Sequence, residues 1–240
     1  MKLKKIASLA LAGVMAVSML TACGDANNID DTQKPNEPDT TPATGYSATF
    51  EGRLSASSAA KISMSDNADL NAALKSAMEF ASNANIAGKY DEDQHGKATF
   101  VNPKAGTPLA QVATELIKKA DDNRESLDKI SKTNTETDVM NLLKPTDKNG
   151  IKYNKDDADI VMLFVVDGGL STNAAVMEVA DKLDGDIDDM VRMYNSNGVD
   201  ETGETMYNYT GSVSADTITL DADHGKSLTF VAVEIVRELV

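Results

Sequence analysis

The chain has 240 residues, of which 38 are acidic and 23 basic, so its net charge near neutral pH is −15. Such a charge repels phosphate backbones and anionic lipid headgroups, which argues against nucleic-acid binding. Tryptophan is absent, aromatic residues make up only 5%, and there is a single cysteine. This composition argues against ring-stacking sugar sites and aromatic hot spots, and it excludes a disulfide framework within the chain.

Residues 1–22 have the three parts of a secretory signal. Lys2, Lys4 and Lys5 form a basic start, residues 6–20 are an apolar run, and small residues follow. The apolar run has about 15 residues, which is shorter than the roughly 20 that a membrane-spanning helix needs. The segment is therefore predicted to direct export and then to be removed. Without its three lysines, the net charge of the exported protein is near −18.

The motif Leu20-Thr21-Ala22-Cys23 follows this signal directly. It resembles the lipobox of bacterial lipoproteins, and the resemblance covers residues 1–24 only. It implies cleavage before Cys23, attachment of diacyl lipid and palmitate to that residue, and a position at the extracytoplasmic face of a bacterial membrane. The alternatives are an ordinary cleavage after Gly24 and a Cys23 that stays a plain thiol.

Residues 23–45 are predicted to be the lipid anchor followed by a disordered tether. The stretch is rich in Asp, Asn, Thr and Pro, and its one isoleucine, Ile29, cannot build a core. Fully extended, this tether would reach roughly 70 Å, and as a coil about 25–30 Å.

The first folded unit is predicted to span residues 46–144. Apolar and polar residues alternate from 46 to 64, which predicts two antiparallel strands with a bend near 55–58. The later patterns predict a helix at 67–82, a hairpin at 86–101, a helix opened by Thr107-Pro108, and a shorter helix at 136–143.

The second unit is predicted to span residues 145–240, with the boundary in the polar stretch 144–157. The run 160–166 is apolar at every position, as in a strand buried on both faces. The patterns that follow predict a helix capped within 171–173, a short helix at 187–194, and strands at 206–213, 217–220 and 228–236. The fold class expected is α+β: an antiparallel sheet with helices packed on one face, built as two strand–helix–hairpin subdomains or as one continuous domain.

Two predicted hairpin turns, at 91–97 and 221–226, have similar sequences and contain the only two histidines of the chain. They could reflect an internal duplication, or only the turn chemistry that Asp and Gly supply. Each turn places two carboxylates near its histidine, so these residues are weak candidates for a metal site or for a general base. The six candidates are Asp91, Asp93, His95, Asp221, Asp223 and His224.

The calcium-loop pattern is incomplete in this chain. Residues 91–96 have its opening rhythm, but His95 occupies position five, and Asn102 stands where a bidentate Glu belongs. The acidic run 184–189 lacks the loop spacing and is interpreted as the start of a helix, where carboxylates are favourable. No metal or other cofactor is therefore expected, although weak calcium binding stays open.

Two short motifs fit penicillin-binding patterns: Ser58-Ala59-Ala60-Lys61 and Ser65-Asp66-Asn67. They lie only seven residues apart, and the chain has no Lys-Thr-Gly, so the match is interpreted as coincidence. No catalytic residue is predicted.

The function expected is non-catalytic binding or scaffolding by a lipid-anchored, extracytoplasmic protein whose ligand is unknown. The partners expected are the membrane, through the anchor, and an unidentified protein or small molecule, but no nucleic acid. One alternative is a carrier that holds an apolar ligand beneath the 46–64 sheet. Another is a hydrolase that uses Asp and His from the two turns, and this requires His95 and His224 to lie close together.

Overall fold

Three long strands form the centre of the protein. The computed structural model describes residues 43–83, 96–120, 135–143, 158–167, 169–191, 193–194, 205–219 and 227–239. The strand order is β1-β5-β6-β3-β2, and β4 pairs with β5 outside this order. Every pairing is antiparallel except β1 with β5, which is parallel. The strands are β1 (Ser63–Met64), β2 (Thr99–Phe100), β3 (Ala158–Asp167), β4 (Met193–Tyr194), β5 (Thr205–Thr219) and β6 (Ser227–Leu239).

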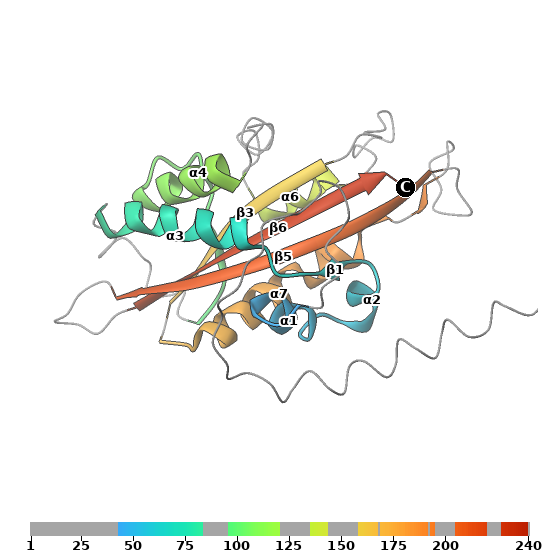
Figure 1. Cartoon of the computed structure of the whole chain (residues 1–240), viewed down its shortest axis with the longest axis horizontal. Coiled ribbons are helices and arrows are strands. Elements are labelled where there is room, and N and C mark those ends of the chain that lie inside the picture. Colours follow the sequence, from blue (N-terminus) through green and yellow to red (C-terminus); the bar gives the residue numbers. More distant parts are fainter. Residues whose placement is uncertain are drawn as a thin grey trace, which may run out of the picture. The chain divides into compact units, whose positions relative to one another are not determined.

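Helices cover both faces of this sheet (Figure 1). The α+β class and the antiparallel sheet with packed helices are confirmed, with helices on two faces where one was expected. We call one side the α3 face, which α3 and α4 cover, and the other the α7 face, which α1, α6 and α7 cover. The helices are α1 (Tyr46–Glu51), α2 (Ala56–Ala59), α3 (Ala68–Asn83), α4 (Pro108–Ala120), α6 (Glu136–Met140), the 3-10 helix η2 (Asn141–Leu143) and α7 (Thr172–Asp188).

The assignment of the two faces follows from strand register. Side chains alternate between the faces of a strand, and partners directly opposite share a face. Arg237 of β6 donates to the carbonyl of Leu143 in η2, so its side of the sheet is the α7 face. Glu234 accepts a hydrogen bond from Asn67 at the start of α3, so it lies on the α3 face.

The predicted buried strand at 160–166 is confirmed as the middle of β3. All seven of these side chains are buried. β6 lies antiparallel beside β3 over ten residue pairs, from Ala158 opposite Arg237 to Asp167 opposite Leu228. Phe100 of β2 closes the other side, with its ring edge-on to Phe164 at a centroid distance of 5.8 Å. Two helix-covered faces explain why this run lacks alternation.

The prediction of strands at 46–64 is wrong for most of that segment. Residues there form α1, α2 and a strand of only two residues, β1. The buried side chains in and around the two helices are Ser47, Phe50, Leu54 and Ser58. These lie three or four residues apart, which is helical spacing. The alternation misled because it placed Ala56 and Ala60 on the inward face and Ser47 on the outward face, whereas the two alanines are exposed and Ser47 is buried.

The helices predicted at 67–82 and after Thr107-Pro108 are confirmed as α3 and α4. Asn67 caps α3, since its side-chain oxygen accepts from the N–H groups of Asp69 and Leu70. Thr107 caps α4 through the N–H of Ala110. Both helices place apolar stripes against the sheet and against each other, and this tertiary packing stabilises them.

The helix predicted at 136–143 is confirmed as α6 followed by η2, with Thr135 as its N-cap. Ser171 caps α7 as expected. The separate short helix predicted at 187–194 is wrong, because α7 continues through Gly185 to Asp188 and Met193–Tyr194 form the strand β4. Glycine weakens a helix interior by only about 1 kcal/mol, and the buried Leu183 and Ile187 on either side hold the last turns in place.

The strands predicted at 206–213 and 217–220 are one continuous strand, β5, which forms an antiparallel hairpin with β6. Strands from both sides of the expected boundary at 144–157 therefore pair in one sheet, and residues 40–240 form one compact unit. Residues 144–157 themselves lie outside the described residues, as do those of the first hairpin before Gly96.

One edge of β5 is closed by the N-terminal segment. We call residues 43–65 the strap. β1 pairs with β5 at Gly211, and the hydroxyl of Ser47 accepts from the N–H of Val213 at 2.9 Å. A Cβ at Gly211 would lie 2.7 Å from Met64 Sδ and 2.8 Å from Ile62 Cδ1, so the glycine makes room for the strap. Such closure protects an edge strand from pairing with another chain.

Candidate functional site

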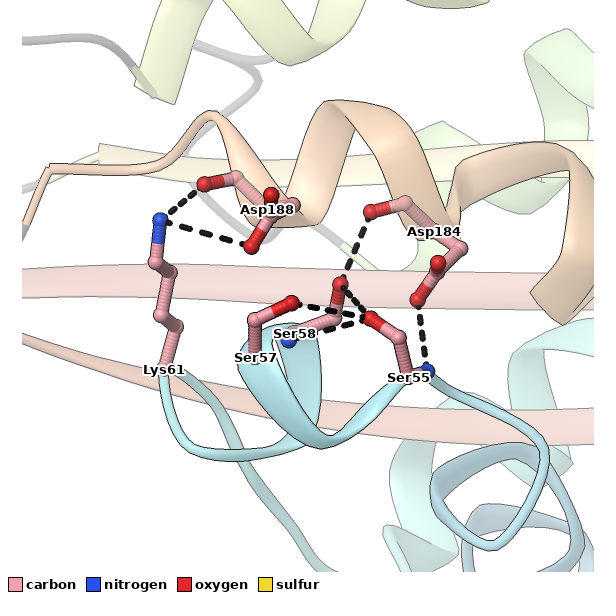
Figure 2. Close-up of polar contacts among 6 residues, drawn as sticks. All are labelled: Ser55, Ser57, Ser58, Lys61, Asp184 and Asp188. Carbon is pink, nitrogen blue, oxygen red and sulfur yellow. Dashed lines mark hydrogen bonds and ion pairs between the residues drawn. The ribbon is translucent and has the colours of Figure 1, made fainter.

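A cluster of hydrogen-bonded polar side chains joins α2 to α7 (Figure 2). Ser55 caps α2, because its hydroxyl accepts from the N–H of Ser58. The N–H of Ser55 in turn donates to Asp184 Oδ1 at 2.8 Å, and the Ser58 hydroxyl donates to the carbonyl of Asp184 at 2.9 Å. One residue of α7 thus holds both ends of the first turn of α2.

The three serine hydroxyls form a short chain. Ser57 and Ser55 lie 3.2 Å apart, and Ser55 donates to Ser58 at 3.0 Å. Ser58 is fully buried, and its hydroxyl donates a hydrogen bond to a backbone carbonyl of α7. A nucleophilic serine needs a base that accepts its proton, and a peptide carbonyl cannot serve as one.

Lys61 points to a different part of α7. Its ammonium donates to the carbonyl of Asp188 and lies 3.8 Å from the carboxylate of the same residue. Figure 2 shows Ser58 directed at Asp184 and Lys61 directed at Asp188. The Ser-x-x-Lys spacing therefore serves to attach α2 at two points, and it does not assemble a serine–lysine pair.

The second short motif also has a structural use. Asp66 accepts three hydrogen bonds from Thr44 and Gly45 at the start of α1, and Asn67 caps α3. Ser65 donates its N–H to Gly211 of β5. The whole motif Ser65-Asp66-Asn67 thus organises the junction between strap, sheet and α3.

The acidic run 184–189 lies at the end of a helix, and its interpretation as a helix start is wrong. Carboxylates in the last turn of a helix face its negative dipole end, so they need compensation. Asp184 is compensated by hydrogen bonds from the strap. Desolvation acts to raise the pKa of its carboxyl, but hydrogen bonds from Ser55 N–H and from the hydroxyls of Ser58 and Ser55 lower this pKa below its ordinary value. Lys61 compensates Asp188.

An ion pair continues this attachment along α7. Arg53 makes a two-point contact with Asp181, with Nε–Oδ1 and Nη2–Oδ2 distances of 2.7 and 2.6 Å. The hydrogen bond and the charge of Asp181 raise the pKa of Arg53. Asp181, Asp184 and Asp188 therefore form one stripe on α7, at three- and four-residue spacing, that contacts the strap.

A second polar group lies between the sheet and α3. Glu234 Oε2 accepts from Asn67 Nδ2 at 2.7 Å and from Ser212 Oγ at 2.8 Å. Because Asn67 gives its amide N–H to Glu234, its carbonyl oxygen is left to cap α3. Sequence reasoning missed this role, although a single acid within the apolar run of β6 was a signal for it.

A third group is buried on the α7 face. Arg237 is fully buried, donates to the Leu143 carbonyl at 2.7 Å, and lies 4.9 Å from the ring centroid of Tyr207. Tyr209 donates to the carbonyl of Val191 at 3.0 Å, and burial raises the pKa of Tyr209 to about 12. Arg237 and Tyr209 therefore supply hydrogen-bond donors to backbone carbonyls at the end of η2 and shortly after the end of α7.

The six weak metal candidates, Asp91, Asp93, His95, Asp221, Asp223 and His224, lie outside the described residues. Within the described ranges, no group of three His, Cys, Asp or Glu side chains is arranged to hold a metal ion. Among the described strands, β2 begins, and β5 ends, at the same end of the sheet where β6 begins.

Cys23 and the rest of residues 1–42 also lie outside the described part of the chain. Among the helices that the structure does describe, none combines the length and the apolar character needed to cross a membrane. Comparison with known protein families, with curated proteins and with solved structures gives no match to this chain. The polar groups described above are thus interpreted from their own geometry.

Proposed function

We propose that this protein is a bacterial lipoprotein, anchored through Cys23 at the extracytoplasmic face of a membrane, where its α+β body has a non-catalytic binding or scaffolding role. The observation that carries the proposal is the order of features in residues 1–23: three lysines, an apolar run too short to span, and Leu20-Thr21-Ala22-Cys23. Two acyl chains or more give stable anchoring, whereas one gives only marginal binding.

The geometry of the α2–α7 junction favours a non-catalytic role. Ser58 and Lys61 have catalytic spacing, but each is engaged by α7 in holding the strap. Glu234 is likewise engaged in orienting the cap of α3. Polar side chains with this much internal hydrogen bonding stabilise a defined surface. That is the property a scaffold at the cell surface needs.

The carrier alternative was based on a sheet at 46–64, and that segment is mostly helical. Phe50, Ile62 and Met64 fill the space between the strap and the rest of the core. Mass spectrometry of the intact protein, extracted without added lipid, tests this alternative directly. A co-purified apolar molecule bound in stoichiometric amount would favour a carrier over a scaffold.

The anchor is tested by expressing the full chain in a bacterial host with labelled palmitate. The unaltered protein is expected to incorporate label and to enter the detergent phase on phase separation. Cys23→Ser is expected to lose both, while the control Asn27→Ser, four residues later, keeps both. Detergent partitioning of Cys23→Ser equal to that of the unaltered protein would overturn the proposal.

A further inference from the structure

The entry of the chain into the folded body depends on one carboxylate oxygen. Asp66 Oδ2 accepts from Thr44 N at 3.0 Å, from Thr44 Oγ1 at 2.9 Å and from Gly45 N at 3.2 Å. All three contacts are exposed to solvent. They close a loop between residues 44 and 66 and place a negative charge at the start of α1. The beginning of the strap is thus held by a single side chain.

The same strap satisfies the outer edge of β5. Gly211 O accepts from Ser65 N at 2.9 Å, and Val213 N donates to Ser47 Oγ at 2.9 Å. Ser47 Oγ also donates to the carbonyl of Ser65 at 2.8 Å, so one buried hydroxyl joins α1 to β5 and to the residue that follows β1. When the strap leaves, these backbone groups of β5 lose the partners that it supplies.

Several of the contacts between the strap and α7 are polar and exposed, namely those of Arg53 with Asp181 and of Ser55 N–H with Asp184. The side chains of Arg53 and Asp181 are 51% and 43% exposed. The strap as a whole buries four large apolar side chains, Phe50, Leu54, Ile62 and Met64. In β3, by contrast, an unbroken run of apolar side chains is buried. Segments with few buried apolar contacts and exposed hydrogen bonds open before the rest of a fold.

We propose that the strap, residues 43–65, is a latch that opens as a separate unit, and that its opening uncovers the edge of β5 at Gly211–Val213. Asp66 controls the first step, because the backbone and side-chain hydrogen bonds of Thr44 both end on it. In the cell the strap is the first folded segment after the tether, so a pull on the anchor acts on this latch first; that consequence rests on the proposed function.

Hydrogen exchange of the full-length protein tests the latch. In Asp66→Ala, the amides of residues 46–59 and of Val213 are expected to exchange about tenfold faster, since hydrogen bonds to a charged group are lost. Amides of β3 at residues 161–165 are expected to keep their rates. The matched control is Asp69→Ala, which removes an exposed aspartate three residues later and is expected to leave the strap rates unchanged.

Hydrogen exchange of the variant Ser47→Ala is a second, independent test of the latch. The substitution removes the acceptor of Val213 N–H, so exchange of that amide is expected to accelerate more than exchange of residues 46–59. If the strap and β3 accelerate together in both variants, the strap is not a separate unit and the proposal fails. It also fails if neither variant changes the rate at Val213.

Cys23→Ser separates this proposal from the proposed anchor. Exchange of the strap in detergent depends on the folded contacts alone, so the same pattern is expected with and without the cysteine. Unaltered membrane partitioning of Cys23→Ser would overturn the anchor and leave the latch standing. Unaltered strap exchange in Asp66→Ala and Ser47→Ala would overturn the latch and leave the anchor standing.

Discussion

The β3–β6 centre and the strap are held in place by different interactions. β3 and β6 bury apolar side chains on both faces and share a ladder of ten residue pairs. The strap buries four large apolar side chains, Phe50, Leu54, Ile62 and Met64, and is held in addition by hydrogen bonds and ion pairs to α7, β5 and Asp66. Apolar burial is non-directional, whereas polar contacts depend on the geometry of their partners. The centre therefore supplies stability, and the strap supplies a defined N-terminal attachment.

The largest expected effect is in the centre. Phe164→Ala removes a fully buried ring that packs against Phe100, and it is expected to lower the free energy of unfolding by about 3–5 kcal/mol. Urea denaturation measures this. The control is Phe80→Ala on α3, where the ring is 40% exposed and the change is expected to be much smaller. Equal losses in the two variants would contradict the assignment of the core.

The contact between centre and strap is tested by two glycines. Gly211→Ala puts a Cβ against Met64 and Ile62, so the strap must shift, at a cost of about 1–3 kcal/mol. Gly185→Ala in α7 meets nothing within 4 Å and is expected to stabilise the protein by up to about 1 kcal/mol. Thermal unfolding of both variants gives the comparison. A stabilising Gly211→Ala would show that β1 does not approach β5 this closely.

Tyr209 gives a pH-dependent effect on the α7 face. Its pKa of about 12 lies above the ordinary value near 10, so the folded protein binds this proton more tightly than the unfolded chain. The resulting stability is fully present below pH about 10 and is lost as the pH rises towards about 12. Tyr209→Phe is expected to cost about 1 kcal/mol at neutral pH, through the lost bond to Val191.

Urea unfolding of Tyr209→Phe as a function of pH measures that prediction. The variant is expected to lack the part of the alkaline loss that Tyr209 causes, while the control Tyr46→Phe in α1 retains it. An unchanged alkaline profile in Tyr209→Phe would mean that this hydroxyl is not buried as described.

The smallest expected effect is at the surface of the strap. Arg53→Ala removes the ion pair with Asp181, and because both side chains are exposed, the free energy of unfolding is expected to change little. Hydrogen exchange of the amides of residues 46–59 is expected to become faster, and the difference from the unaltered protein is expected to shrink as salt is added. Lys118→Ala, which breaks an ion pair within α4, is the control and is expected to leave the strap unaffected.

Patterns that depend on neighbouring residues were predicted well. Asn67, Thr107, Thr135 and Ser171 were recognised as caps or lie where helices were expected to start, because a cap acts on the next turn of its own chain. The run 160–166 was recognised as a buried strand because burial on two faces requires apolar residues at every position.

Features that depend on residues far away in the sequence were predicted poorly. The alternation at 46–64 could not reveal that Ser47 and Ser58 are buried, because their acceptors and donors are Ser65, Val213 and Asp184. The acidic run 184–189 could not be placed at a helix end without knowing that Ser55 and Lys61 compensate it. Glu234 was missed for the same reason, since its partner Asn67 lies 167 residues away.

The sequence by itself determined the α+β class, the main helices and the central strand, since each depends on local periodicity or capping. Only the tertiary structure decided the form of the strap, the two-sided helix cover and the use of the polar residues. Small polar side chains fit a helix, a strand or a turn almost equally well, so the partners that satisfy their hydrogen bonds decide among these. Those partners come from parts of the chain that meet only after folding.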